Sequence, residues 1–170
     1  GVEKLAGNSA VTKGQRELIQ KLLHDFPDAA ELFEYEDYCK TPTLGTASAF
    51  ITMALDANLH EIDSESGYMQ YIATRPRVQK HGSHGLFSSS TSVDLASAMS
   101  ELEAHEGNVW TIIYSLRRED AARLEFDNAD AWRTLLMENA PTLAKSMKIS
   151  LNNFHWYAAF HDEGHHPHIH

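Results

Sequence analysis

The chain has 170 residues, 42% of them hydrophobic and 22% charged, and its formal net charge at pH 7 is −10. This length predicts a single domain with a buried core, and the absence of a long apolar run excludes a membrane-spanning helix. One cysteine cannot form an internal disulfide or a thiolate zinc site, so we expect a cytoplasmic protein. The acidic balance also argues against a broad basic surface for nucleic acid.

Helical hydrophobic spacing dominates the first sixty residues. Thr12 is a candidate N-cap for a helix over 13–25, in which apolar residues recur at the spacing of one helix face. Asp28 is expected to cap a second, shorter helix. A third helix is predicted to begin at Thr46 or Ser48. The acidic residues of the second helix are interpreted as a solvated face rather than as a metal or acid–base cluster.

The segment 67–76 gives mixed signals. Tyr68 and Tyr71 fit one helical face, and a proline ends whatever precedes it. The segment leads into a loop over 80–92 that is rich in glycine, serine and histidine, and we expect this loop to lie near a ligand. Another helix is predicted to follow and to end near residue 106.

The strongest strand signal in the middle of the chain covers 109–116, where β-branched and aromatic residues follow a glycine. We expect this strand to be the antiparallel neighbour of a second strand over 154–161. Between them, helices are predicted over 118–124 and 128–147, and Pro141 is expected to kink or divide the longer one. The predicted fold class is α+β: an antiparallel sheet with helices packed on one face and an open, reactive face opposite.

The last sixteen residues carry the most specific functional signal. Period-two alternation places His161 on one face of its strand, a turn follows, and His168 and His170 then share one face of the next strand while Ile169 points to the other. A hairpin of this kind brings His161 level with the other two histidines, so that three imidazoles converge on one point. We therefore predict a metal site.

Two simpler interpretations of these histidines are an expression tag and a loose metal-binding tract. Both are disfavoured because Pro167 and Ile169 interrupt the histidines and the strand alternation continues through them. The turn residues Asp162 and Glu163 could orient a ligand histidine or serve the turn alone.

Three neutral imidazoles with open coordination positions indicate a catalytic rather than a closed structural site. The expected task of the cation is Lewis-acid activation of a water or a phosphoryl oxygen. By ligand softness, imidazoles suit Mn²⁺, Zn²⁺, Ni²⁺ or Cu²⁺ better than Mg²⁺.

The stretch 156–170 reads Trp-Tyr-Ala-Ala-Phe-His-Asp-Glu-Gly-His-His-Pro-His-Ile-His. It resembles the three-histidine motif of plasmid-mobilisation relaxases of the MobP/MobL group, in the His-hydrophobic-His (HUH) endonuclease superfamily. The stretches 32–38, 71–79, 107–110 and 115–124 extend the resemblance over most of the chain.

The resemblance implies a metal-dependent enzyme that nicks single-stranded DNA at a plasmid or conjugative-element transfer origin through a 5′-phosphotyrosine intermediate. It implies Mn²⁺ or Mg²⁺ as the divalent metal, held by His161, His168 and His170, and we favour Mn²⁺. Tyr71 is the first choice of nucleophile and Tyr68 the second, although the nucleophile can also lie in upstream sequence.

Basic residues on both sides of Pro76 would then bind flanking phosphates: Arg75, Arg77 and Lys80. The implied partners are single-stranded DNA at the transfer origin, accessory mobilisation proteins and a coupling protein. The resemblance further implies an HUH-type palm, and we expect residues 1–170 to be an incomplete part of a relaxase domain. Within it we expect a mainly helical part over 1–106 and a sheet part over 107–170.

Three other functions stay open at this point. A rolling-circle replication initiator uses the same metal arrangement. A non-covalent metal-dependent nuclease or hydrolase would use water in place of a tyrosine. A non-enzymatic metal-binding module is the third alternative.

Overall fold

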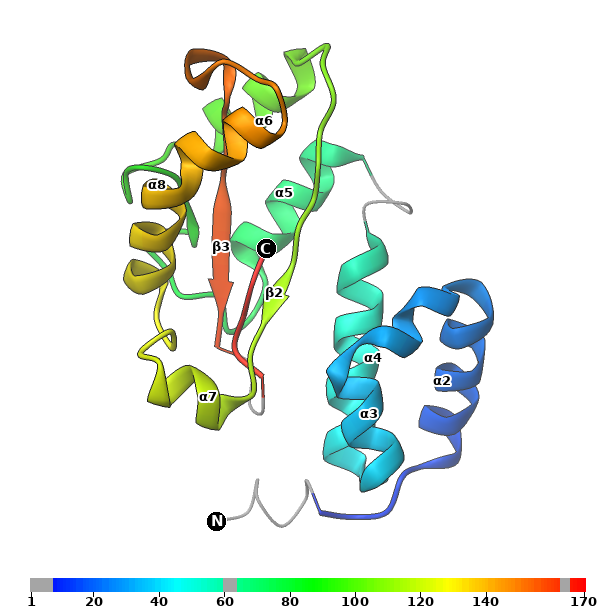
Figure 1. The fold of residues 1–170 in the computed structure, drawn as a ribbon. Coiled ribbons are helices and arrows are strands. Elements are labelled where there is room, and N and C mark those ends of the chain that lie inside the picture. The colour runs from blue at the N-terminus through cyan, green and yellow to red at the C-terminus, as the bar shows by residue number, and fades with distance from the viewer. Residues whose placement is uncertain (1–7, 60–63, 163–165) are drawn as a thin grey trace. The chain divides into compact units, whose positions relative to one another are not determined.

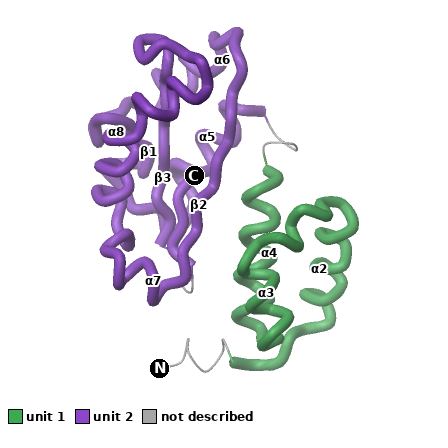
Figure 2. The backbone as a smooth tube through the Cα atoms, in the orientation of Figure 1, with its two compact units in different colours: residues 1–63 green, residues 64–170 purple. Residues whose placement is uncertain are grey.

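The computed structural model describes residues 8–59, 64–162 and 166–170. The chain forms two compact units, Gly1–Asp63 and Ser64–His170, which Figure 2 shows in different colours. Each unit is described by itself. The expectation of a helical part ending at residue 106 stays a prediction.

The first unit is helical. It contains α2 (Lys13–Asp25), a 3₁₀ turn (Pro27–Glu31), α3 (Phe33–Lys40) and α4 (Leu44–Asn58), and both α2 and α3 pack against α4. Because each helix carries one apolar stripe, the three bury those stripes against one another. The buried core consists of Val11, Ile19, Leu22, Ala29, Ala47, Phe50 and Ala54.

Helix caps explain where these helices begin. Thr12 is the predicted N-cap of α2: its hydroxyl accepts from the Gln15 amide, and the Gln15 side chain accepts from the Thr12 amide. The prediction that α4 begins at Thr46 or Ser48 is wrong, because Thr43 forms the same reciprocal arrangement with Thr46. The helix expected after Asp28 is also displaced, because that segment is a 3₁₀ turn and α3 starts at Phe33.

The second unit contains a small antiparallel sheet with α-helices around it (Figure 1). Its strands are β1 (Leu86–Phe87), β2 (Tyr114–Ser115), β3 (Ala158–His161) and β4 (His168–Ile169), in the order β1-β3-β4-β2. Its helices are α5 (Glu65–Thr74), α6 (Leu95–Ala104), α7 (Arg118–Arg123) and α8 (Ala129–Ser146), with a 3₁₀ turn at Leu151–Asn153. The expected α+β class is confirmed.

The expected strand neighbours are wrong. Of the segment 109–116, only Tyr114–Ser115 forms a strand, and it pairs with β4 rather than with β3. The short hairpin gives β4 the place beside β3, and this moves β2 one position outward. On its other side β3 pairs with β1, which lies inside the loop expected to be irregular.

One face of the sheet is closed by α8. Ala158, Phe160 and Ile169 share a core with Trp132 of α8, and Leu135 and Leu136 pack against it. α8 runs through Pro141 as one helix, so the expected division there is wrong.

The opposite face is not open as expected. Neighbouring residues on a strand point to opposite faces, so His161 and His168 lie on the side away from α8. There α5 contacts them: the ring of His161 hydrogen-bonds to the Ile72 carbonyl, and Tyr68 reaches His170. Helices therefore pack on both faces, and the histidines lie between β3–β4 and α5.

Candidate metal centre

The β3–β4 hairpin aligns three histidines on one face of the sheet. Its register places Phe160 opposite Ile169 and His161 opposite His168. His170 continues the pairing, because its amide and carbonyl exchange hydrogen bonds of 3.1 and 3.0 Å with those of Ala159. The alternation read from the sequence thus places the three rings together, as predicted.

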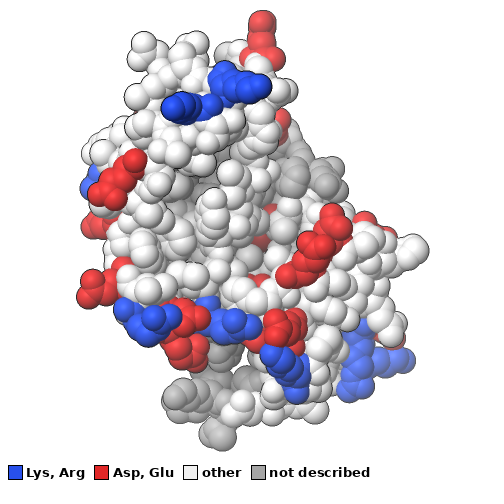
Figure 3. Space-filling model, in the orientation of Figure 1, with Lys and Arg blue, Asp and Glu red and all other residues white. Residues whose placement is uncertain are grey.

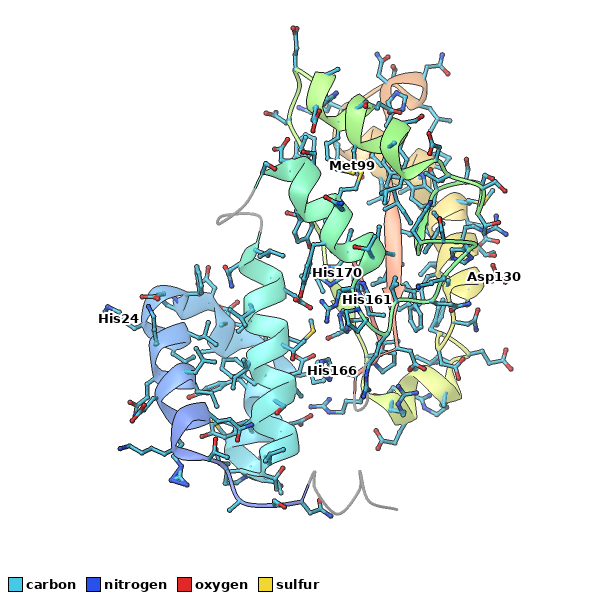
Figure 4. All side chains as sticks on the ribbon, turned by 180° about the vertical axis from the view of Figure 1, so that it is seen from behind. His24, Met99, Asp130, His161, His166 and His170 are labelled. Carbon is cyan, nitrogen blue, oxygen red and sulfur yellow. The ribbon has the colours of Figure 1, made fainter. Side chains whose placement is uncertain are left out.

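The three rings form a nearly equilateral triangle. Ring centroids are 5.1 Å apart for His161 and His168, 4.9 Å for His161 and His170, and 5.1 Å for His168 and His170. Each residue offers one ligand atom, and these atoms lie within 4.8 Å of one another. Exposed fractions of 0%, 0% and 8% for residues 161, 168 and 170 show that protein, not bulk water, surrounds the rings. Figure 4 shows His161 next to His170.

Hydrogen bonds determine which ring nitrogen faces a ligand. A carbonyl can only accept, so His161 donates Nε2–H to the Ile72 carbonyl at 2.7 Å, and His168 donates Nδ1–H to the His166 carbonyl at 3.1 Å. This leaves the Nδ1 lone pair of His161 and the Nε2 lone pair of His168 for an ion. His161 Nδ1 is buried and has no hydrogen-bond partner among the described residues.

His161 is held in its neutral form. Its pKa is lowered to about 2, mainly by burial and to a lesser extent by the nearby charges of His170, Arg75 and His168, while the hydrogen bond to the Ile72 carbonyl acts in the opposite direction. Because a metal binds neutral imidazole, a buried ring that resists protonation is suited to this task. The donor set, the burial and the uncompensated Nδ1 together fit a divalent cation.

The two candidate tyrosines lie on α5 in different environments. Tyr68 is buried, and its hydroxyl lies 2.6 Å from His170 Nδ1. Tyr71 is 41% exposed, and the guanidinium of Arg75 lies over its ring, 5.3 Å from the ring centroid. The structure therefore brings Tyr68 into direct contact with His170 and leaves Tyr71, one turn along the same helix, partly exposed.

The predicted basic residues lie along the segment that follows α5. Arg75 is buried, and its charge is close enough to lower the pKa of His161. The Arg77 carbonyl accepts from the Asp162 amide at 3.0 Å, which places its backbone beside the end of β3. Lys80 is exposed, and the residue before it pairs with β3 through the Phe160 carbonyl.

Sequence reasoning missed two contributors to the site. His166 accepts from His168 through its carbonyl, and its ring stacks on that of His168 with centroids 5.5 Å apart. The position of His166, two residues before His168, could have indicated that it belongs to the site. The Ile72 carbonyl could not be predicted, because a backbone group has no sequence signature.

Among the described residues, Asp162 has a partner other than the ligand histidines. Its carboxylate pairs with Arg118 of α7. Glu163, the other turn carboxylate considered, lies outside the described residues.

Comparison with known proteins identifies the chain. The family model for MobL relaxases matches residues 1–170, the whole chain. No curated protein and no solved structure gave a significant match. No helix in the described ranges is both long and apolar enough to cross a membrane. The three-histidine hairpin and the family match agree, and the chain belongs to the MobL relaxases.

Proposed function

We propose that this chain carries the metal-binding part of a relaxase that nicks single-stranded DNA at a transfer origin and holds the cleaved end covalently. The convergence of His161, His168 and His170 on one point carries the proposal. The three imidazoles would hold a divalent cation, and a site with only three protein ligands keeps coordination positions available for DNA oxygens. The small antiparallel sheet that presents them supports an HUH-type palm.

The proposed cofactor is Mn²⁺, with Mg²⁺ as the second choice. A divalent cation in this position supplies Lewis-acid stabilisation of the charge that develops on the phosphoryl oxygens. The chain's own part is to keep His161 neutral and to hold all three rings oriented and shielded from water. The hydrogen bonds to the Ile72 and His166 carbonyls and the burial of the rings do this.

Tyr71 is the proposed nucleophile. Its ring is accessible, and it is connected to the metal centre through Arg75, whose guanidinium covers the ring while its charge reaches His161. A guanidinium that lies over the phenol ring and whose charge acts on His161 is placed to bind the phosphate of the reacting strand. Arg77 and Lys80, farther along the same segment, are proposed to bind flanking phosphates.

The chemical step is a transesterification. The Tyr71 phenol oxygen forms a bond to phosphorus, and the bond from phosphorus to the 3′ oxygen of the preceding nucleotide breaks. The phenol proton leaves to solvent, and the departing oxygen takes up a proton to become a 3′ hydroxyl. The 5′ phosphate stays on the tyrosine, and no water is consumed, so the reverse reaction rejoins the strand.

The direct test incubates the intact protein with labelled single-stranded DNA from its transfer origin and Mn²⁺. We expect a protein–DNA adduct that is stable in SDS. His168→Ala and Tyr71→Phe should each abolish it. Tyr114→Phe, which removes a hydroxyl from a similarly exposed tyrosine on the α8 side of the sheet, should keep it.

Other outcomes separate the alternatives. Cleaved DNA without an adduct would indicate a hydrolase that uses water. Tight metal binding without cleavage would leave a metal-binding module. An adduct that persists in Tyr71→Phe would move the nucleophile to another residue.

A further inference from the structure

Helix α5 contacts two of the three histidines from one of its faces. The Tyr68 hydroxyl meets His170 Nδ1, and four residues later the Ile72 carbonyl accepts from His161 Nε2. Residues four apart on a helix lie one above the other, so a single helix face orients rings from two different strands. Tyr68 and His170 are 102 positions apart in sequence, and both are buried.

The chemistry of an imidazole determines which partner donates in the hydrogen bond between Tyr68 and His170. A neutral ring carries one proton, and a ring that binds a metal through Nε2 must carry that proton on Nδ1. His170 then donates Nδ1–H, and the Tyr68 oxygen accepts it at 2.6 Å. Partners of this kind fix the tautomer and the orientation of a ligating histidine.

The same contact separates Tyr68 from the attacking group. Its oxygen lies at Nδ1, on the side of the imidazole away from the ligating nitrogen, so the ring itself stands between the phenol and an ion. The Tyr68 ring also packs edge-on against His170, with centroids 5.9 Å apart, and is only 4% exposed. A phosphodiester has little access to it.

We infer that Tyr68 is a positioning residue, which orients His170 for the metal, and that it is not the nucleophile. The two tyrosines of α5 thus have different roles: the buried Tyr68 orients a metal ligand, and the exposed Tyr71 attacks the phosphate. The inference rests on the proposed function only for the second of these roles.

The test measures Mn²⁺ affinity and adduct formation separately on the intact protein. Mn²⁺ binding is followed by the electron paramagnetic resonance signal of the free ion, without DNA. Tyr68→Phe keeps the ring that packs against His170 and removes only the hydroxyl. Tyr157→Phe is the matched control, because the Tyr157 hydroxyl donates to Glu101 on α6 at 2.7 Å and to none of the three ligand histidines.

We expect Tyr68→Phe to weaken Mn²⁺ binding by about 10- to 100-fold, the usual effect of losing a partner of a ligand histidine. Tyr157→Phe and Tyr71→Phe should stay within about twofold of wild type, since neither removes such a partner. At saturating Mn²⁺, Tyr68→Phe should again form the SDS-stable adduct, whereas Tyr71→Phe should not.

Two results would overturn the inference: wild-type Mn²⁺ affinity in Tyr68→Phe, or no adduct from this variant even when its site is saturated. Thermal unfolding of each variant establishes that the fold is intact. If wild-type protein binds Mn²⁺ but forms no adduct, the proposed function fails, and the affinity measurements still decide whether Tyr68 orients His170.

Discussion

His161 shows how burial prepares a side chain for a metal. Its ring is fully buried, one nitrogen donates to a carbonyl, and the other has no hydrogen-bond partner among the described residues. A buried polar atom without a partner costs about 1–3 kcal/mol, and a bound cation removes that cost. Without a cation this fully buried ring therefore costs stability, and metal binding should stabilise the fold.

The depressed pKa of His161 makes metal-free protein sensitive to acid. In the unfolded chain this ring titrates near pH 6.5, whereas in the folded chain its pKa is about 2. Between these values the unfolded state binds more protons, so stability falls as pH falls. From pH 7 to pH 5, this one ring should lower the free energy of unfolding by about 2 kcal/mol.

Urea unfolding of metal-free protein at several pH values measures this effect. His161→Gln keeps a side-chain N–H for the Ile72 carbonyl but does not titrate, so its loss of stability between pH 7 and pH 5 should be smaller by about that amount. Equal losses in the variant and in wild type would contradict the assignment.

Arg77 adopts an unusual backbone conformation beside the site. Its φ is 69°, in the left-handed region that disfavours residues with a Cβ. Arg77→Gly relieves this strain but adds freedom to the unfolded chain, so stability should change by no more than about 1 kcal/mol. If the side chain holds one phosphate, both Arg77→Gly and Arg77→Ala should reduce the salt dependence of single-stranded DNA binding by about 0.7 in the log–log slope.

Fluorescence anisotropy with a labelled single strand at several salt concentrations measures that slope. Arg123→Ala, which removes an equal charge from the exposed end of α7, serves as the control. A wild-type slope in both Arg77 variants would contradict a phosphate contact by this side chain.

At the scale of the element, the position of β3 depends on the segment after α5, which packs closely beside this strand. Val78 bridges to His161, and a Cβ added at Gly85 would lie 2.1 Å from Val78 Cγ2 and 2.8 Å from the Gln79 carbonyl oxygen. Gly85→Ala must displace this segment, so we expect a loss of about 1–3 kcal/mol in unfolding free energy and weaker Mn²⁺ binding.

Gly82→Ala provides the comparison. Its φ of 84° makes alanine strained, by about 1 kcal/mol, but nothing lies within 4 Å of the added Cβ. Chemical unfolding and Mn²⁺ titration should show a smaller loss of stability and no change in affinity. A Gly85→Ala protein with wild-type affinity would mean that the Val78 bridge does not support the site.

Local patterns explain why the hairpin was predictable and the sheet order was not. Period-two alternation around His161 and the His-Ile-His sequence determine which rings share a face, and both patterns span a few residues. The placement of β2 beside β4 depends on pairing between distant segments, and β1 is only two residues long. The contact between Tyr68 and His170 likewise joins helix and strand across most of the unit.

At the scale of the whole molecule, the unit 64–170 contains the three histidines together with Tyr68, Ile72 and His166, which form hydrogen bonds with them. A fragment over 64–170 should therefore bind Mn²⁺ within about threefold of the affinity of the whole chain, because it keeps the three ligand histidines and these hydrogen-bond partners. Titration of both proteins in the same buffer measures this. A much weaker fragment would show that the helical unit contributes to the site.

Charge is distributed unevenly over a chain with a formal charge of −10. On the face seen in Figure 3, basic side chains gather over α7 and acidic ones lie among them. The proposed DNA contacts therefore rely on local charge, that of Arg75 and Arg77 and the positive charge that a divalent cation would add at the histidines.

The most direct test of the metal centre is a crystal structure of Mn²⁺-loaded protein with anomalous scattering recorded at the manganese absorption edge. We predict one strong anomalous peak per chain, bonded to His161 Nδ1 and to the Nε2 atoms of His168 and His170. A peak bound elsewhere, or no peak among these three rings at saturating Mn²⁺, would contradict the account.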